Sequence, residues 1–126
     1  MSASNDPAAG PTTFFTTDHR ECDEAWANFE QAASAGDAAA ARDAWSRFRD
    51  RMRRHFSMEE EVLFPAIEVA TGMHGVGPVA VMRQEHAQMR ALLDQMTARA
   101  SAGDLQAVLD HGDTLLMVIQ QHNAKE

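Results

Sequence analysis

The chain has 126 residues, of which 44% are hydrophobic and 24% are charged, values typical of one soluble globular domain. Its formal net charge of −8 disfavours broad binding of nucleic acid phosphates, and its single cysteine excludes an intrachain disulfide and a thiolate-only zinc site. No apolar run approaches the roughly 18 residues of a membrane span. The first residues lack the basic and apolar regions of a secretory signal, so a cytoplasmic location is the default expectation.

Residues 1–13 are small and polar and include two prolines. We expect them to form a flexible arm before a single domain at residues 14–126. In that domain Ala, Leu, Met, Gln, Glu and Arg are plentiful, and the alternation typical of strands is absent. The domain is therefore predicted to be all-α.

Capping and breaking residues divide the domain into four expected helices. The first runs from about Thr17 to Ala33, and Asp37 is the expected N-cap of the second. The second helix continues past Phe64, where Pro65 must kink or end it because proline removes a hydrogen-bond donor.

A loop at residues 71–77 is expected to separate the second and third helices. Pro78 suits the first turn of the third helix, which reaches about Ala100. Asp104 is the expected N-cap of a fourth helix that runs to the last residue.

The two halves of the domain resemble each other. The sequence ASAGD begins at residue 33 and again at residue 100, a shift of 67 residues. At this shift His19 falls on His86, His55 on His122, and a glutamate follows each member of the second pair by four residues. Two copies are too few for a solenoid. We therefore predict an up-down-up-down four-helix bundle made of two helical hairpins related by a pseudo-two-fold axis.

Each expected helix carries mostly apolar residues at alternating spacings of three and four, which is typical of the core of a bundle. Each of these four seams also contains one histidine, and the second and fourth place a glutamate one turn later. The expected core positions are His19, Cys22, Trp26, Phe29 and Ala33 in the first helix; Trp45, Phe48, Met52, His55, Glu59 and Val62 in the second; Val79, Met82, His86, Met89, Leu93 and Met96 in the third; and Val108, Gly112, Leu115, Ile119, His122 and Glu126 in the fourth.

Four imidazoles and two carboxylates buried in one layer would be costly without partners. Metal cations change this balance, because each imidazole can supply a nitrogen lone pair and each carboxylate can bridge two cations. Nitrogen and carboxylate ligands together suit iron, manganese or zinc. Two carboxylates between two pairs of histidines favour a pair of metals over a single ion.

Four short segments carry a resemblance to a known family. They are Asp18-His19, the stretch HFSMEEEVLFP from His55 to Pro65, Glu85-His86, and the stretch HNAKE from His122 to Glu126. In this combination the sequence resembles the hemerythrin-like (HHE cation-binding) domains, which are four-helix bundles with a non-haem di-iron centre. The resemblance implies two iron ions with an oxo or hydroxo bridge. It assigns His19 and His55 to one iron and His86 and His122 to the other, with Glu59 and Glu126 bridging both.

One position departs from the oxygen-carrying members of the family. They have a second histidine four residues after the third-helix histidine, and this sequence has Arg90 there. The resemblance then implies open positions at both irons, which suit binding or sensing of oxygen, nitric oxide or peroxide. Two alternatives stay open: a di-iron enzyme or iron–sulfur repair-type stress protein, and an iron- or redox-responsive interaction module.

Several other polar residues are expected to play no part in the centre. The arginine-rich stretch of the second helix is expected to be a solvated face with internal ion pairs. His74 and His111 are expected at the surface, and Cys22 is expected to be a buried filler. Glu60 and Glu61 are expected to face outward, with a supporting contact from Glu60 to the centre as the alternative.

Overall fold

The computed structural model describes the backbone of residues 10–125 and the side chains of residues 18–124. Within these residues all regular structure is helical, so the predicted all-α class is confirmed. The elements in chain order are α1 (Gly10–Ser34), α2 (Ala38–Met58), the π-helical segment η3 (Glu59–Leu63), α3 (Phe64–Thr71), α4 (Pro78–Ser101) and α5 (Leu105–Lys125).

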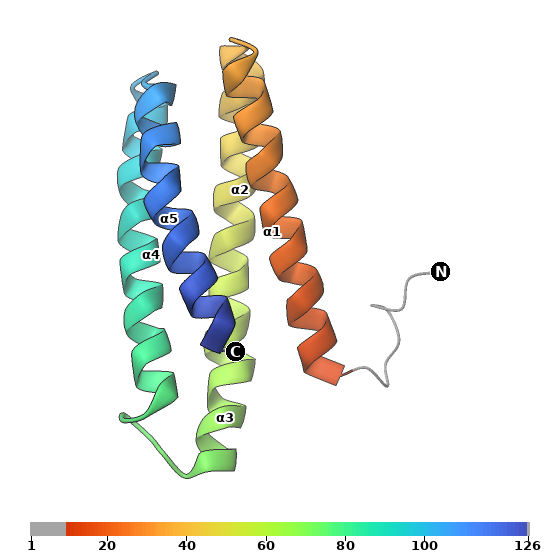
Figure 1. Cartoon of the computed structure of the whole chain (residues 1–126), viewed down its shortest axis with the longest axis vertical. Helices are drawn as coiled ribbons and strands as arrows, with labels where there is room; N and C mark the ends of the chain where they lie inside the picture. The colour runs from red at the N-terminus through yellow and green to blue at the C-terminus, as the bar shows by residue number, and fades with distance from the viewer. Residues whose placement is uncertain (1–9, 126) are drawn as a thin grey trace.

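The helices form a bundle in which α1 packs along α2 and α4 packs along α5 (Figure 1). Contacts between α2 and α4, and between α1 and α5, join the two pairs. The short turns α1–α2 and α4–α5 lie at one end of the bundle, and the loop between α3 and α4 lies at the other (Figure 1). A pseudo-two-fold relation between the pairs remains a prediction.

The two short turns follow the repeated sequence. Gly36 and Gly103 have positive φ angles of 77° and 81°, a conformation that glycine adopts without steric cost. The side chains of Asp37 and Asp104 then accept backbone N–H hydrogen bonds at 3.1 Å from residues three positions later. Both aspartates are therefore N-caps, as predicted.

Helix α1 begins at Gly10, earlier than the expected start near Thr17. Pro11 lies in its first turn, where its missing N–H removes no intrahelical bond. The arm expected at residues 1–13 therefore overlaps the helix at residues 10–13, and residues 1–9 lie outside the described part of the chain.

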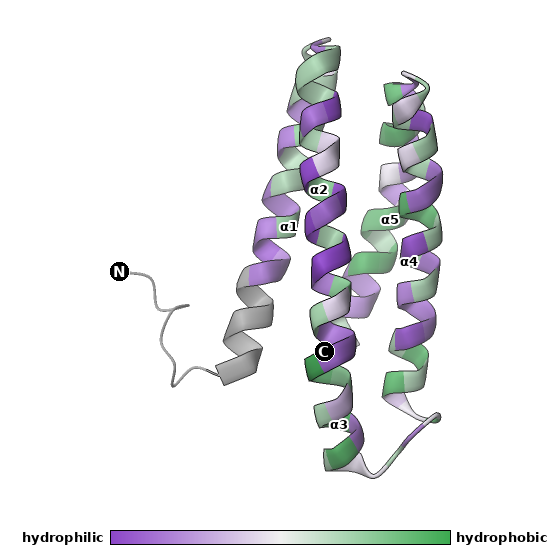
Figure 2. Cartoon of the chain, turned by 180° about the vertical axis from the view of Figure 1, so that it is seen from behind, coloured by the Kyte–Doolittle hydropathy of each residue, from purple (hydrophilic) through white to green (hydrophobic). Residues whose placement is uncertain are grey.

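The predicted seams form the core. Between α1 and α2 the core is aromatic, with ring centroids of neighbouring tryptophans and phenylalanines 5.2 to 5.7 Å apart. Methionine and leucine side chains fill it between α4 and α5. The outward face of α2 is largely hydrophilic (Figure 2). Among the described residues, no helix is both long enough and apolar enough to cross a bilayer.

Among the residues whose side chains the structure describes, one predicted core position is wrong. Val62 is 55% exposed, and Phe64 is fully buried instead. The cause is the π-helical segment, in which the N–H of Phe64 bonds to the carbonyl of Glu59, five residues back. The widened turn shifts the register of the seam. It lies directly before Pro65, which has no N–H for the ordinary helical bond, and the helical rod then continues through α3.

Gly112 of α5 lies directly against the side chain of Trp26 on α1. A Cβ atom at this position would lie 2.3 Å from Cζ2 and 2.4 Å from Cη2 of Trp26. We expect Gly112→Ala to lower the free energy of unfolding by about 1 kcal/mol, because overpacking costs about 1 to 3 kcal/mol and the gain in helix propensity returns about 1 kcal/mol. Urea unfolding measures this change. In a Trp26→Phe background, which lacks both crowded atoms, the same substitution should be neutral or stabilising, and a persisting loss would contradict this explanation.

Candidate metal centre

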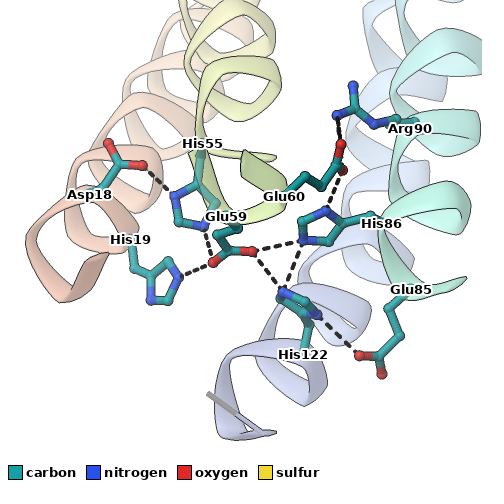
Figure 3. A network of polar contacts seen from close by, with 9 residues as sticks. All are labelled: Asp18, His19, His55, Glu59, Glu60, Glu85, His86, Arg90 and His122. Atoms are coloured by element: carbon teal, nitrogen blue, oxygen red, sulfur yellow. Dashed lines mark hydrogen bonds and ion pairs between the residues drawn. The ribbon is translucent and has the colours of Figure 1, made fainter. Parts of the chain in front are cut away.

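The centre is built around the carboxylate of Glu59, which is 0% exposed and lies at the start of the π-helical segment (Figure 3). Its Oε2 lies 3.3 Å from Nε2 of His19 and 2.8 Å from Nε2 of His55. Its Oε1 lies 2.7 Å from Nε2 of His86 and 2.9 Å from Nε2 of His122. One carboxylate thus joins two histidine pairs, one from α1 and α2 and one from α4 and α5.

Carboxylates also contact the Nδ1 atoms of His55, His86 and His122. The Nδ1 of His55 hydrogen-bonds to Asp18 on α1. The Nδ1 of His122 lies 3.1 Å from Oε1 of Glu85 on α4. The Nδ1 of His86 lies 2.6 Å from Oε2 of Glu60 (Figure 3). Ionised carboxylates only accept hydrogen bonds, so each of these Nδ1 atoms carries the proton.

This proton placement decides what the centre can hold. In a neutral imidazole with the proton on Nδ1, Nε2 carries a lone pair. The lone pairs of His86 and His122 would face the Glu59 oxygen and, at 3.1 Å, each other. Such a cluster of acceptors needs a cation between its members. Ligand atoms about 2.1 Å from one metal lie about 3 Å apart when they subtend a right angle at it. The separations of 2.7 to 3.3 Å between Glu59 and the four imidazoles agree with this value, and the donor set therefore fits metal.

Two groupings of side chains could each hold a metal ion, with ligand atoms within 4.8 Å of one another: His19, His55 and Glu59, and Glu59, His86 and His122. Burial raises the pKa of the Glu59 carboxyl. When the Nε2 atoms carry protons instead of facing a metal, the four imidazoles donate hydrogen bonds to this carboxylate and lower its pKa by more, so the net shift is downward. Burial lowers the pKa of His55, and its hydrogen bonds to Asp18 and Glu59 raise it to a net upward shift. Carboxylate and imidazoles thus hold one another in place.

Residues 10–126 match the hemerythrin HHE cation-binding domain. The chain belongs to this family. No curated protein and no solved structure gives a significant match. Membership implies cation binding, and the two histidine–glutamate groupings of this hemerythrin-like chain fit a metal site.

The structure brings five of the six predicted ligands to one place, and the sixth, Glu126, lies outside the described residues. His19 is the most accessible of the four histidines, with a side chain that is 19% exposed. The prediction that Glu60 faces outward is wrong, and the alternative of a contact with the centre is confirmed, because its carboxylate bonds to His86 and to Arg90. The signal that could have found this contact is the proline that follows the glutamate run, since it favours a local change of helical register.

The other residues expected to play no part in the centre lie away from the histidine pairs, except for Cys22. His74 is mostly exposed, and Nδ1 of His111 lies 2.7 Å from a backbone carbonyl of its own helix. Burial, followed by the nearby Asp18 carboxylate, raises the pKa of Cys22 to about 12. Its side chain is therefore a neutral thiol, which is neither a good nucleophile nor a metal ligand.

Asp18 and Glu85 occupy corresponding positions in the two helix pairs, so their removal should have similar effects. We expect Asp18→Ala and Glu85→Ala each to weaken metal binding about 10- to 100-fold, the usual effect of removing a carboxylate that orients a ligating histidine. Competition with a chromogenic chelator measures this affinity. Glu24→Ala removes an exposed carboxylate from α1 and serves as the control. Equal affinity in all three variants would contradict an orienting role.

Proposed function

We propose that this hemerythrin-like protein holds two iron ions and uses them to bind or sense oxygen, nitric oxide or peroxide. His19 and His55 would hold one ion, and His86 and His122 the other. Glu59 would bridge the two, and we propose that Glu126 is a second bridge. The observation that carries the proposal is the buried Glu59 carboxylate, each oxygen of which faces a separate histidine pair.

When bound, an iron pair supplies electrons to a small ligand at an open coordination position. The protein keeps the protons of three imidazoles on Nδ1, through Asp18, Glu60 and Glu85, so that their Nε2 lone pairs face the metal positions. Glu59 supplies negative charge between the positions and holds them together as their charge changes. These tasks need no organic substrate.

A small cavity borders the centre and supports a ligand of few atoms. It is lined by His19, His55 and His122 together with apolar side chains that include Cys22, Met52 and Met89. The space that a water-sized molecule can occupy in it is about 10 Å³, close to the least volume that holds one water molecule. Its size and apolar lining favour a diatomic gas.

Metal analysis of protein purified without added metal tests the proposal. The expected result is two irons per chain and an optical spectrum in air with a charge-transfer band from an oxygen bridge. Nitric oxide or peroxide should then change that spectrum. Fewer than one metal per chain after reconstitution with ferrous iron would overturn the proposal.

A di-iron enzyme is the alternative that fits the same cavity, because peroxide and nitric oxide are substrates as well as ligands. Measuring the steady-state consumption of peroxide or nitric oxide distinguishes an enzyme from a carrier or sensor. Binding without turnover favours a carrier or sensor, and sustained consumption with a reductant present favours an enzyme. A metal-dependent change in stability without either property would favour the interaction module.

Cys22 tests the cavity directly. We expect Cys22→Ala to speed nitric oxide binding to the reduced iron-loaded protein several-fold, because it enlarges the cavity, and Cys22→Leu to slow it by filling the space. Stopped-flow spectroscopy measures both rates. Cys22→Ser keeps the volume while removing the thiol, and it should bind at the wild-type rate. A serine variant as altered as the alanine variant would show that the thiol itself matters.

A further inference from the structure

His86 differs from His55 and His122 in the origin of its carboxylate partner. Asp18 and Glu85 each reach across to the neighbouring helix of their own pair. Glu60 instead comes from the π-helical segment and reaches His86 on α4, in the other helix pair, at 2.6 Å. No repeat of the sequence predicts this contact.

Arg90 holds Glu60 in turn. Its Nη2 lies 3.1 Å from Oε1 and 3.0 Å from Oε2 of Glu60, one turn after His86 along α4. The guanidinium lies over the ring of Phe56, with its central carbon 5.1 Å from the ring centroid. That ring is buried, and its centroid lies 4.8 Å from that of His86. Arg90, Glu60 and His86 follow one another toward the centre (Figure 3). The ring of Phe56 packs against both Arg90 and His86 and closes the group.

Electrostatics predicts how Glu60 and Arg90 each change the reduction potential of a metal bound at His86. A carboxylate that accepts a hydrogen bond from Nδ1 makes the Nε2 atom of the same imidazole donate its electron pair to a metal more strongly. A guanidinium that also binds this carboxylate neutralises part of its charge and therefore reduces the electron donation from Nε2. More negative charge at a metal ligand stabilises the higher oxidation state. Glu60 should therefore lower the reduction potential of the metal at His86, and Arg90 should raise it.

We propose that Arg90 and Glu60 are positioning residues that set, through His86, the reduction potential of the metal held by His86 and His122. Position 90, which holds a further histidine in the oxygen-carrying members of the family, would thus tune the reduction potential of the metal in this chain. The proposal rests on the proposed iron centre, and its tests are chosen so that the two can fail separately.

The first test uses zinc, which is diamagnetic and has no redox chemistry. In zinc-loaded protein, nitrogen-15 NMR should show a proton on Nδ1 of His86. Its proton resonance should move downfield in Arg90→Met, where the hydrogen bond to Glu60 strengthens, and upfield in Glu60→Gln, where an amide oxygen replaces the carboxylate. Absence of bound zinc in the wild-type protein would count against the metal centre itself.

The second test is redox titration of the iron-loaded protein. At fixed solution potential we expect Arg90→Met to raise the ratio of oxidised to reduced metal about tenfold, which is a fall in potential of about 59 mV for one electron. Glu60→Gln should shift the ratio in the opposite direction. Arg90→Lys keeps the charge and should lie closer to wild type than Arg90→Met.

Arg83→Met is the matched control. Arg83 lies on the same helix, its guanidinium carbon is 5.3 Å from the centroid of Phe64, and that ring packs on His86. However, Arg83 bonds to Glu68 at 3.2 Å and not to Glu60. The control should change the NMR signal and the potential much less than Arg90→Met. Two results would overturn the proposal without contradicting the iron centre, provided that metal is bound. One is a shift in potential of the same sign in Arg90→Met and Glu60→Gln. The other is a shift in Arg83→Met as large as that in Arg90→Met.

Discussion

Glu59→Gln is expected to release both metals. Each Glu59 oxygen faces one histidine pair at 2.7 to 3.3 Å, and the carboxylate is fully buried. The substitution preserves shape, but it removes the charge and turns one oxygen into an NH₂ group that faces a histidine pair as a donor. The loss of affinity should exceed about 100-fold, because removing partners that only orient ligands already costs about 10- to 100-fold.

The loss of affinity is measured as the metal content that remains after gel filtration in a buffer containing a weak chelator. Glu61→Gln is the matched control, since Glu61 lies two residues away in the same π-helical segment, is exposed, and changes charge equally. It should retain two metals per chain. A Glu59→Gln protein that also retains two metals would show that this carboxylate is not the shared ligand.

His55→Ala and His122→Ala are each expected to remove one metal and to leave the other in place. The two histidines belong to different groupings around Glu59, and they are 3% and 2% exposed. Each is oriented by a carboxylate from the helix it packs against, Asp18 for one and Glu85 for the other. Their losses should therefore be similar, and the double variant should bind no metal.

Elemental analysis together with unfolding curves tests this expectation. His111→Ala is the control, because His111 is a half-buried histidine of α5 whose Nδ1 bonds to a backbone carbonyl. It should keep both metals. Loss of both metals in either single variant would mean that neither position fills without the other, contrary to independent sites that share one bridge.

Local sequence signals by themselves determined where the helices begin and which of their faces are buried. Asp37 and Asp104 cap helices because their side chains accept orphan N–H groups, and this depends only on neighbouring residues. The spacing of apolar residues determined which faces are buried, since helical periodicity is a local property. For the same reason His55, Glu59, His86 and His122 could be assigned to the core from their spacing alone, and the family resemblance then assigned the ligands.

Tertiary structure alone decided what surrounds the centre. Val62 and Phe64 exchanged roles, and Glu60 turned toward α4, because the helix before Pro65 adopts π-helical bonding. The missing N–H of Pro65 favours that bonding, and residues turn through smaller angles within it than the α-helical period assumes. The bond from Arg90 to Glu60 joins residues 30 positions apart, and only the approach of α4 to η3 brings them together. Periodicity predicts which face of a helix is buried, but not which side chains on another helix that face will meet.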